Sequence, residues 1–156
     1  VENPAYNEAN NISSAMCVRY LLSNSYVLEG DILLHNPKII QKYQYQSNYC
    51  GIKVDRTDDW CLFENKGRVT GYAVGGENCH QIMGITYWTE EDGKKLGEYI
   101  KKVYEMPGGK ERYWDQVALQ YYIDDFDIAI RECSFDDFIE IDTFNELKAI
   151  DKSYDV

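Results

Sequence analysis

Two segments carry pairs of carboxylates at spacings that could do chemistry. Tyr26-Val-Leu-Glu29-Gly-Asp31 is an apolar stretch that ends in two acids around a glycine. In α/β sheets, ligands bind just beyond the carboxyl ends of strands. Mg²⁺ prefers a few carboxylates there, with waters and substrate phosphates as its other ligands. A plain polar turn after a strand explains the same six residues, so taken alone they leave both interpretations open.

The second pair lies in Ile139-Glu140-Ile141-Asp142. Strand alternation would place Glu140 and Asp142 on one face and the isoleucines on the other. Two like charges side by side repel, and a cation between them would relieve the repulsion. A solvated strand edge is the alternative. A further acid, Asp115, follows Tyr113-Trp114 at the start of a predicted helix, where the helix dipole favours an acid whether or not it binds anything.

Aromatic residues near these acids suggest a site for a cation. The pairs Tyr87-Trp88 and Tyr113-Trp114 and the single Trp60 are the prominent clusters. Ring faces beside carboxylates form cages for quaternary ammonium groups. Core packing is the alternative use of such side chains, and we expect Tyr87 or Trp88 to be core.

Composition excludes several classes of function. The chain has 156 residues, one domain's worth, and its 16 Lys+Arg against 27 Asp+Glu give a net charge of −11. A nucleic-acid phosphate clamp or an anionic membrane surface requires a basic patch, so we expect neither partner. No run approaches the roughly 18 apolar residues of a membrane span.

Familiar nucleophile, nucleotide and metal motifs are absent from the sequence. It contains no GxxxxGK[ST], GxGxxG or GxSxG pattern. Its five cysteines are odd in number and include no CxxC pair, so we predict ordinary reduced thiols, several of them buried. Reduced thiols fit a cytoplasmic location best.

The elements that must position these residues alternate between helix and strand, which indicates an α/β or mixed fold. Apolar periodicity and capping signals predict helices at 11–22, 36–45, from Thr89 to about 106, at 113–123 and after Thr143. They predict strands at 25–28, 49–54, 60–64, 68–74, 82–87 and 127–132.

Taken in order, six segments resemble the bacterial CTP:phosphocholine cytidylyltransferases, nucleotidyltransferases related to the sugar-1-phosphate family. No single motif is decisive, but the six cover almost the whole chain. They are Asn3-Pro-Ala-Tyr6 with Asn10-Asn11-Ile-Ser13-Ser14, Tyr26-Val-Leu-Glu29-Gly-Asp31, Asp58-Asp59-Trp60, Gly84-Ile-Thr-Tyr-Trp88, Tyr113-Trp114-Asp115 and Glu140-Ile-Asp142-Thr.

The resemblance implies a Mg²⁺-dependent enzyme that makes CDP-choline from CTP and phosphocholine for the decoration of surface polysaccharides. It assigns Asp31 and Asp142 as metal ligands and places Glu140 in the same acidic cluster. It makes Trp60 and Tyr113 the walls of a choline cage. Asp115 becomes an acidic partner of the trimethylammonium group or of the metal shell. Family members often carry Asp in place of Glu29, so Glu29 ranks below Asp31.

The family opens with a Gly-rich loop, a basic pair and a lysine, which this sequence lacks. The resemblance therefore predicts a single domain, 1–156, that is a fragment: the C-terminal two-thirds of a Rossmann-like nucleotidyltransferase with a mixed sheet. We expect the 156-residue chain not to transfer a cytidylyl group efficiently. We also expect a homo-oligomer or partner to cover the exposed sheet edge.

Three alternatives remain open. The acceptor could be a sugar-1-phosphate or an aminoalkylphosphonate, in which case polar side chains would replace the aromatic cage. The chain could instead be an inactive module that only binds the cationic substrate. A glycosidase that uses Glu140 and Asp142 is disfavoured, because two acids on one strand face lie too close to flank a bond at about 5–9.5 Å.

Overall fold

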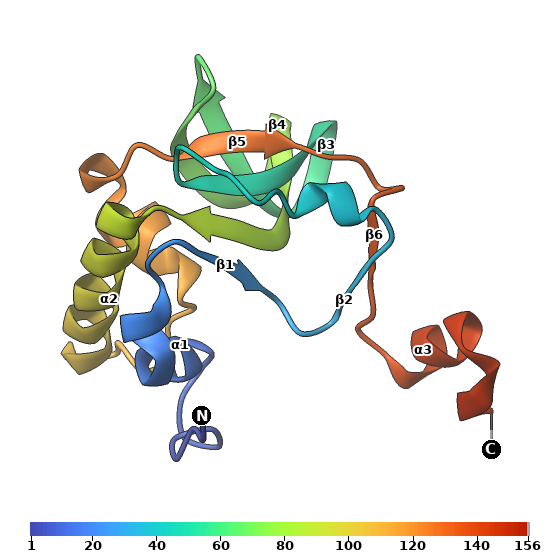
Figure 1. Cartoon of the computed structure of the whole chain (residues 1–156), viewed down its shortest axis with the longest axis horizontal. Coiled ribbons are helices and arrows are strands. Elements are labelled where there is room, and N and C mark those ends of the chain that lie inside the picture. The colour runs from blue at the N-terminus through green and yellow to red at the C-terminus, as the bar shows by residue number, and fades with distance from the viewer. Residues whose placement is uncertain (156) are drawn as a thin grey trace.

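A mixed four-stranded sheet forms the centre of the computed structural model, which describes residues 1–155 (Figure 1). Its strands are β1 (Ser25–Leu28), β3 (Asn48–Asn65), β4 (Arg68–Trp88) and β5 (Ala129–Glu132), in the order β1-β4-β3-β5. β4 runs antiparallel to β1 and β3, whereas β3 and β5 are parallel. The sequence-based expectation of a mixed α/β fold is confirmed.

β3 and β4 form one long hairpin where the sequence predicted four shorter strands. Residues 65–67 form the turn between the strands predicted at 60–64 and 68–74, with Asn65 opposite Arg68. The polar stretch 55–59 lacks apolar alternation, yet it continues β3 because it pairs across the hairpin, with Arg56 opposite Glu77. The register shifts between Thr57 and Trp60, so a bulge separates the two halves of the strand.

Two helices pack together beside the sheet, and both were predicted from their sequence (Figure 1). α1 (Ile12–Val18) runs into a 3₁₀ turn, η1 (Arg19–Leu21). α2 (Glu90–Glu105) starts at Thr89, whose hydroxyl accepts from the Asp92 backbone at 3.2 Å. Its buried face repeats at helical spacing and consists of Gly93, Leu96, Gly97, Ile100 and Val103.

Two predicted helices are wrong in length. The segment 36–45 forms only a 3₁₀ turn, η2 (Pro37–Ile39); Asn36 caps it as expected, but Ile40 is already extended. Residues 41–46 offer no apolar face to bury, so the turn ends there. The segment 113–123 contains a π-helical turn, η3 (Val117–Tyr121), and a 3₁₀ turn, η4 (Ile123–Asp125).

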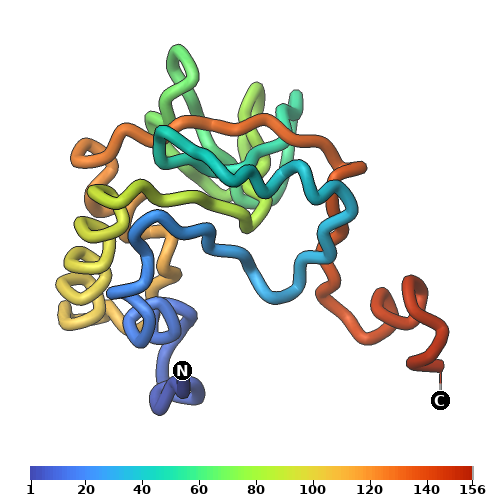
Figure 2. Tube along the Cα trace, viewed as in Figure 1, coloured from blue at the N-terminus to red at the C-terminus, as the bar shows by residue number. Residues whose placement is uncertain are grey.

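A second, two-stranded sheet leads to the C-terminal end. β2 (Ile32–Leu34) pairs antiparallel with β6 (Phe138–Glu140), and α3 (Phe144–Ile150) and the turn η5 (Lys152–Tyr154) follow. The helix predicted after Thr143 is confirmed, and Thr143 and Glu146 form a capping box at its start. The strand was expected to continue to Asp142. Instead, the backbone N–H of Asp142 donates to the Glu146 carboxylate at 2.9 Å, so the helix cap replaces strand pairing there. Figure 2 shows that the C-terminal segment with α3, in red, lies apart from the four-stranded sheet.

The main core lies where the sheet meets the helices. Trp88 is fully buried and meets Tyr49, Trp114 and Phe126 edge-on, and Tyr87 is also buried, as predicted. All five cysteines are free, and three of them are buried, in line with the expectation that several are buried. Within the described residues, no helix is long and apolar enough to cross a bilayer.

Candidate active site

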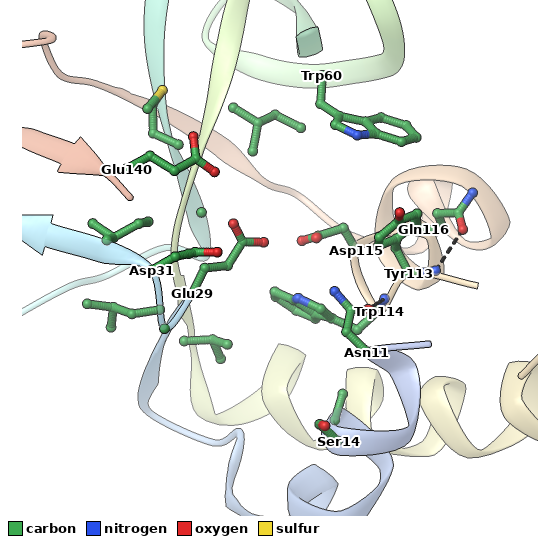
Figure 3. A pocket seen from close by; sticks show the side chains of 18 of the residues that line it. Asn11, Ser14, Glu29, Asp31, Trp60, Tyr113, Trp114, Asp115, Gln116 and Glu140 are labelled. Atoms are coloured by element: carbon green, nitrogen blue, oxygen red, sulfur yellow. Dashed lines mark hydrogen bonds between the residues drawn. The ribbon is translucent and has the colours of Figure 1, made fainter. Parts of the chain in front are cut away.

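A cavity of about 860 Å³ collects all six residues to which the resemblance assigns a metal, acidic or choline-binding role. Figure 3 shows five of them, Asp31, Trp60, Tyr113, Asp115 and Glu140. Its walls come from α1, the end of β1, the β3–β4 hairpin, the 113–116 segment and the end of β6. The predicted residues that line it are Asp31, Trp60, Tyr113, Asp115, Glu140 and Asp142. Their roles stay predictions, but six side chains scattered over more than a hundred residues share one cavity.

Three carboxylates gather on one side of this cavity. Glu29, Asp31 and Glu140 each offer an oxygen, and these oxygens lie within 4.8 Å of one another. The β2–β6 pairing brings them together, because Ile32 lies opposite Glu140 and the Ile141 N–H donates to the Asp31 carbonyl at 2.9 Å. Carboxylate oxygens at this spacing fit a hard divalent cation such as Mg²⁺.

Two of these carboxyl groups, Glu29 and Glu140, have raised pKa values, and neighbouring negative charges contribute to both. Burial raises the pKa of Glu29, and the charges of Asp31 and Asp59 raise it further. Burial likewise raises the pKa of Glu140, with Asp142 as the next contributor. A bound cation would relieve this repulsion.

Asp142 lines the cavity but is not in the three-carboxylate group, since it lies beyond the end of β6. Glu29, which the sequence ranked below Asp31, is in that group. Spacing along the chain does not show which of these acids meet, because the position of each depends on where β2 and β6 stop pairing.

Gly84 is a site residue whose role the sequence did not reveal. It lies opposite the end of β1, and its carbonyl accepts from the Glu29 N–H at 2.9 Å. Its φ of +43° is in the left-handed region, and a Cβ there would lie 2.8 Å from the Glu29 Cδ and 2.8 Å from Ile32. Only glycine lets the strand pass so close to the carboxylate.

The aromatic wall lies on another side of the cavity. The Trp60 and Tyr113 rings meet edge-on with centroids 5.9 Å apart, and Tyr72 stacks on Trp60 at 5.3 Å with an angle of 5°. Tyr113 is 44% exposed, so a ligand can reach it. Tyr72 was missed because only the β3–β4 register, with Leu62 opposite Tyr72, shows which strand residues neighbour Trp60.

Asp115 stands between the aromatic wall and the acidic cluster (Figure 3). The Tyr49 hydroxyl donates to its carboxylate at 2.9 Å. Burial raises the pKa of Asp115 to about 7; the Tyr49 hydrogen bond opposes this rise, and the charge of Glu29 adds to it. The segment is held from the other side by Asn11, whose side-chain oxygen accepts from the Trp114 N–H at 2.9 Å.

The fold is that of nucleotidyltransferases. The structure superimposes on the CTP:phosphocholine cytidylyltransferase of Streptococcus pneumoniae with a TM-score of 0.81, at 23% identity, over 97% of this chain and 66% of that one. A structure described as a glucose-1-phosphate thymidylyltransferase from Bacillus anthracis matches with a TM-score of 0.65, at 15% identity, over 94% of this chain and 62% of that one.

Sequence comparison places the chain among homologues of cytidylyltransferases, which confirms the resemblance. It is 28% identical to the 2-aminoethylphosphonate cytidylyltransferase of Lancefieldella rimae, over 99% of this chain and 64% of the relative. It is 24% identical to the choline-phosphate cytidylyltransferase of Haemophilus influenzae, over 94% of this chain and 64% of the relative. The chain thus spans slightly less than two thirds of these relatives. No family model matches the sequence.

Proposed function

We propose that this chain supplies the metal and acceptor side of a cytidylyltransferase that makes CDP-choline from CTP and phosphocholine. The observation that carries the proposal is that one cavity is lined by the touching rings of Trp60 and Tyr113, by Asp115, and by the carboxylate group of Glu29, Asp31 and Glu140. CDP-choline is an activated donor, and we assign its use to the decoration of surface polysaccharides.

In the proposed reaction, a phosphate oxygen of phosphocholine attacks the α-phosphorus of CTP. A new P–O bond forms, the bond to the β-phosphate breaks, and pyrophosphate leaves in line. Such a reaction needs little covalent chemistry from the protein; positioning and charge neutralisation dominate.

Asp31 would hold Mg²⁺ together with Glu29 and Glu140, and Asp142, which the resemblance assigns as a ligand, lines the same cavity. The bound ion would offset the charge that develops on the phosphates. The carboxylates themselves repel a phosphate, so without a cation this wall would disfavour the acceptor. The acids therefore orient and hold the cation, and the aromatic wall holds the other end of the acceptor.

A quaternary ammonium fits the aromatic wall because it has no N–H to donate. It is bound by ring faces and by diffuse attraction to a carboxylate. Tyr72 covers one face of the Trp60 indole and Tyr113 meets it edge-on, and these rings line the cavity together with Asp115.

An acceptor with a primary ammonium group is the second candidate, because one of the relatives is named for 2-aminoethylphosphonate, which has such a group. Its three N–H donors need acceptors, which Asp115 and Glu29 could supply. The aromatic pair favours phosphocholine, whereas the carboxylates suit either acceptor.

Titration of the chain with both acceptors, followed by tryptophan fluorescence with and without Mg²⁺, tests the proposal. Trp60 is half-buried whereas Trp88 and Trp114 are buried, so a ligand in the cage should change mainly the Trp60 signal. We expect phosphocholine to bind about tenfold or more tightly than 2-aminoethylphosphonate, and Trp60→Ala to reduce its affinity by about tenfold. The affinity of Trp60→Ala would be measured by calorimetry, because this substitution removes the fluorescent reporter. Phe135→Ala, an exposed aromatic outside the cavity, is the matched control.

Preference for 2-aminoethylphosphonate would replace the first candidate by the second. If neither acceptor changes the spectrum at millimolar concentration, or if Trp60→Ala binds as the parent does, the assignment of the cage is wrong.

A further inference from the structure

Tyr72 stacks on Trp60 in the cavity, although it is not one of the two predicted cage residues. The two rings are nearly parallel, with an interplanar angle of 5° and centroids 5.3 Å apart. Trp60 lies opposite Val74 in the hairpin, and Tyr72 lies two residues from Val74, on the same face of β4. Diagonal neighbours of this kind are within reach of aromatic side chains. The stack is therefore a product of the hairpin register.

The core holds Tyr72 more firmly than it holds Trp60. Leu62, which lies opposite Tyr72, is fully buried, and Tyr72 itself packs against the main core. Val74, which lies opposite Trp60, is 61% exposed, and the register of β3 shifts just before Trp60. The Tyr72 hydroxyl donates to the exposed Gln120 side chain at 3.3 Å, which is long for an O–H···O hydrogen bond. Ring packing, rather than this hydrogen bond, therefore fixes Tyr72.

The other ring beside the Trp60 indole supports it less well. Tyr113 meets the indole edge-on, with centroids 5.9 Å apart and an interplanar angle of 63°, and it is itself exposed. An edge-on ring leaves its neighbour room to tilt. A parallel ring at stacking distance resists a tilt, because the tilt would drive atoms of the two faces into each other. Tyr72 therefore sets the plane of the indole.

We propose that Tyr72 is a positioning residue that determines specificity: by holding the plane of the Trp60 indole, it makes the cavity prefer a quaternary ammonium to a primary ammonium. The inference rests on the proposed function, because it takes the rings of the cavity as the cation-binding wall. A quaternary ammonium has no N–H and depends on ring faces, whose attraction for a cation varies with their orientation. A primary ammonium is held mainly through its N–H donors, so the plane of the indole matters less for it.

Direct contact between Tyr72 and the ligand is the alternative, because Tyr72 also lines the cavity. A double-mutant cycle with Trp60 separates the two explanations. If Tyr72 acts through the indole, its replacement has no further effect once Trp60 has been replaced by alanine. If Tyr72 contacts the ligand itself, its replacement weakens binding whether or not the indole is present.

Phosphocholine and phosphoethanolamine are the suitable probes, because they differ only in the methyl groups on nitrogen. The contributions of the phosphate and of Mg²⁺ therefore cancel in the ratio of the two affinities. Both affinities would be measured by calorimetry at constant Mg²⁺ for the parent, Tyr72→Phe, Tyr72→Leu, Tyr72→Ala, Trp60→Ala and the double variant Trp60→Ala/Tyr72→Leu. Tyr122→Leu is the matched control: it removes a half-buried tyrosine that stacks on Tyr99, with centroids 3.8 Å apart, outside the cavity. Circular dichroism would establish that each variant is folded.

The parent should bind phosphocholine about tenfold more tightly than phosphoethanolamine. Tyr72→Leu packs against the core but cannot stack, so its affinity for phosphocholine should fall about three- to tenfold, the amount that an aromatic pair contributes, while its affinity for phosphoethanolamine stays within about twofold. Tyr72→Phe retains the stack and should keep most of the parent's preference, as should Tyr122→Leu. In the Trp60→Ala background, Tyr72→Leu should change neither affinity by more than about twofold.

The outcomes separate this inference from the proposed function. If the parent binds neither probe, or binds both equally, the quaternary ammonium site is wrong and the role of Tyr72 is wrong with it. If the parent prefers phosphocholine and Tyr72→Leu keeps that preference, or loses affinity for both probes alike, the cation site stands and the role of Tyr72 is wrong.

The remaining variants complete the test. If Tyr72→Leu still weakens phosphocholine binding in the Trp60→Ala background, Tyr72 contacts the ligand and its positioning role is wrong. Loss of the preference in Tyr72→Phe, which retains the stack, would also contradict that role. Tyr72→Ala decides the comparison of the two probes if Tyr72→Leu does not fold.

Discussion

The carboxylates that line the cavity differ in burial and in hydrogen bonding, so they suit different ligands. Asp115 is held by a core phenol and has its pKa raised to about 7 by burial, whereas Asp31 is exposed within the three-carboxylate group. The first environment suits a group that meets an organic cation, and the second suits groups that share a metal ion. Two acids of the same residue type thus have separate roles in the proposed site.

At this scale we predict that Asp115→Asn stabilises the fold increasingly as pH rises. The folded-state pKa of Asp115 lies above the ordinary aspartate value of about 3.9, so its contribution to stability is complete below about pH 4 and is lost as pH rises through about 7. Asparagine loses nothing over this range and still accepts the Tyr49 hydrogen bond. We expect a gain on the order of 2 kcal/mol at pH 8 relative to pH 4, reduced from the full shift because Asp115 is only half-buried.

Urea unfolding of the parent and Asp115→Asn at both pH values, without divalent ions, measures this gain. A difference in unfolding free energy that stays constant between the two pH values would show that Asp115 titrates normally. Asp124→Asn, an exposed acid in η4, should show no such trend and serves as the control.

At the scale of elements, the acidic cluster depends on where strands approach. β1 delivers Glu29 beside β4, and the β2–β6 pair delivers Asp31 beside Glu140. Gly84 in β4 adjoins both, at a φ of +43°. The cluster is therefore a property of one strand crossing, and a single added methyl group there should disturb it.

We predict that Gly84→Ala destabilises the protein by about 2 kcal/mol or more, because alanine must adopt a left-handed φ and its Cβ meets Glu29 and Ile32. Gly30→Ala is the matched control, since a Cβ at Gly30 meets nothing within 4 Å. Chemical denaturation measures both. Equal effects of the two substitutions would contradict the close approach at Gly84.

At the scale of the whole molecule, tertiary folding concentrates negative charge that the unfolded chain spreads out. The chain carries a net charge of −11, and three of its carboxylates come within 4.8 Å of one another although Glu29 and Glu140 are far apart in sequence. An ion that binds the folded state alone stabilises it by mass action.

We therefore predict that millimolar Mg²⁺ raises the melting temperature by a few degrees, and that Glu140→Gln removes most of this rise. Glu98→Gln, an exposed acid in α2, removes the same charge away from the cluster and should keep it. Sodium chloride at matched ionic strength separates binding from screening. Equal Mg²⁺ responses of the two variants would show that the cluster does not hold the ion.

Local signals determined much of this protein. Thr89 and Thr143 mark two helix starts, the turn at 65–67 marks the hairpin, and six ordered segments indicate the family resemblance. The helix starts and the turn depend on contacts within a few residues, which a sequence displays directly. The resemblance depends on residue identities alone. The sequence also displays directly the charge balance that argues against a nucleic-acid partner.

The tertiary structure alone decided which residues meet. The length of β3 and β4 depends on cross-strand pairing of polar residues, the end of β6 on the competing helix cap, and the phenol beneath Asp115 on strand register. Tyr49, Tyr72 and Gly84 have no local pattern that distinguishes them from other tyrosines and glycines. Their roles arise from contacts between residues distant in sequence, and periodicity and spacing carry no information about such contacts.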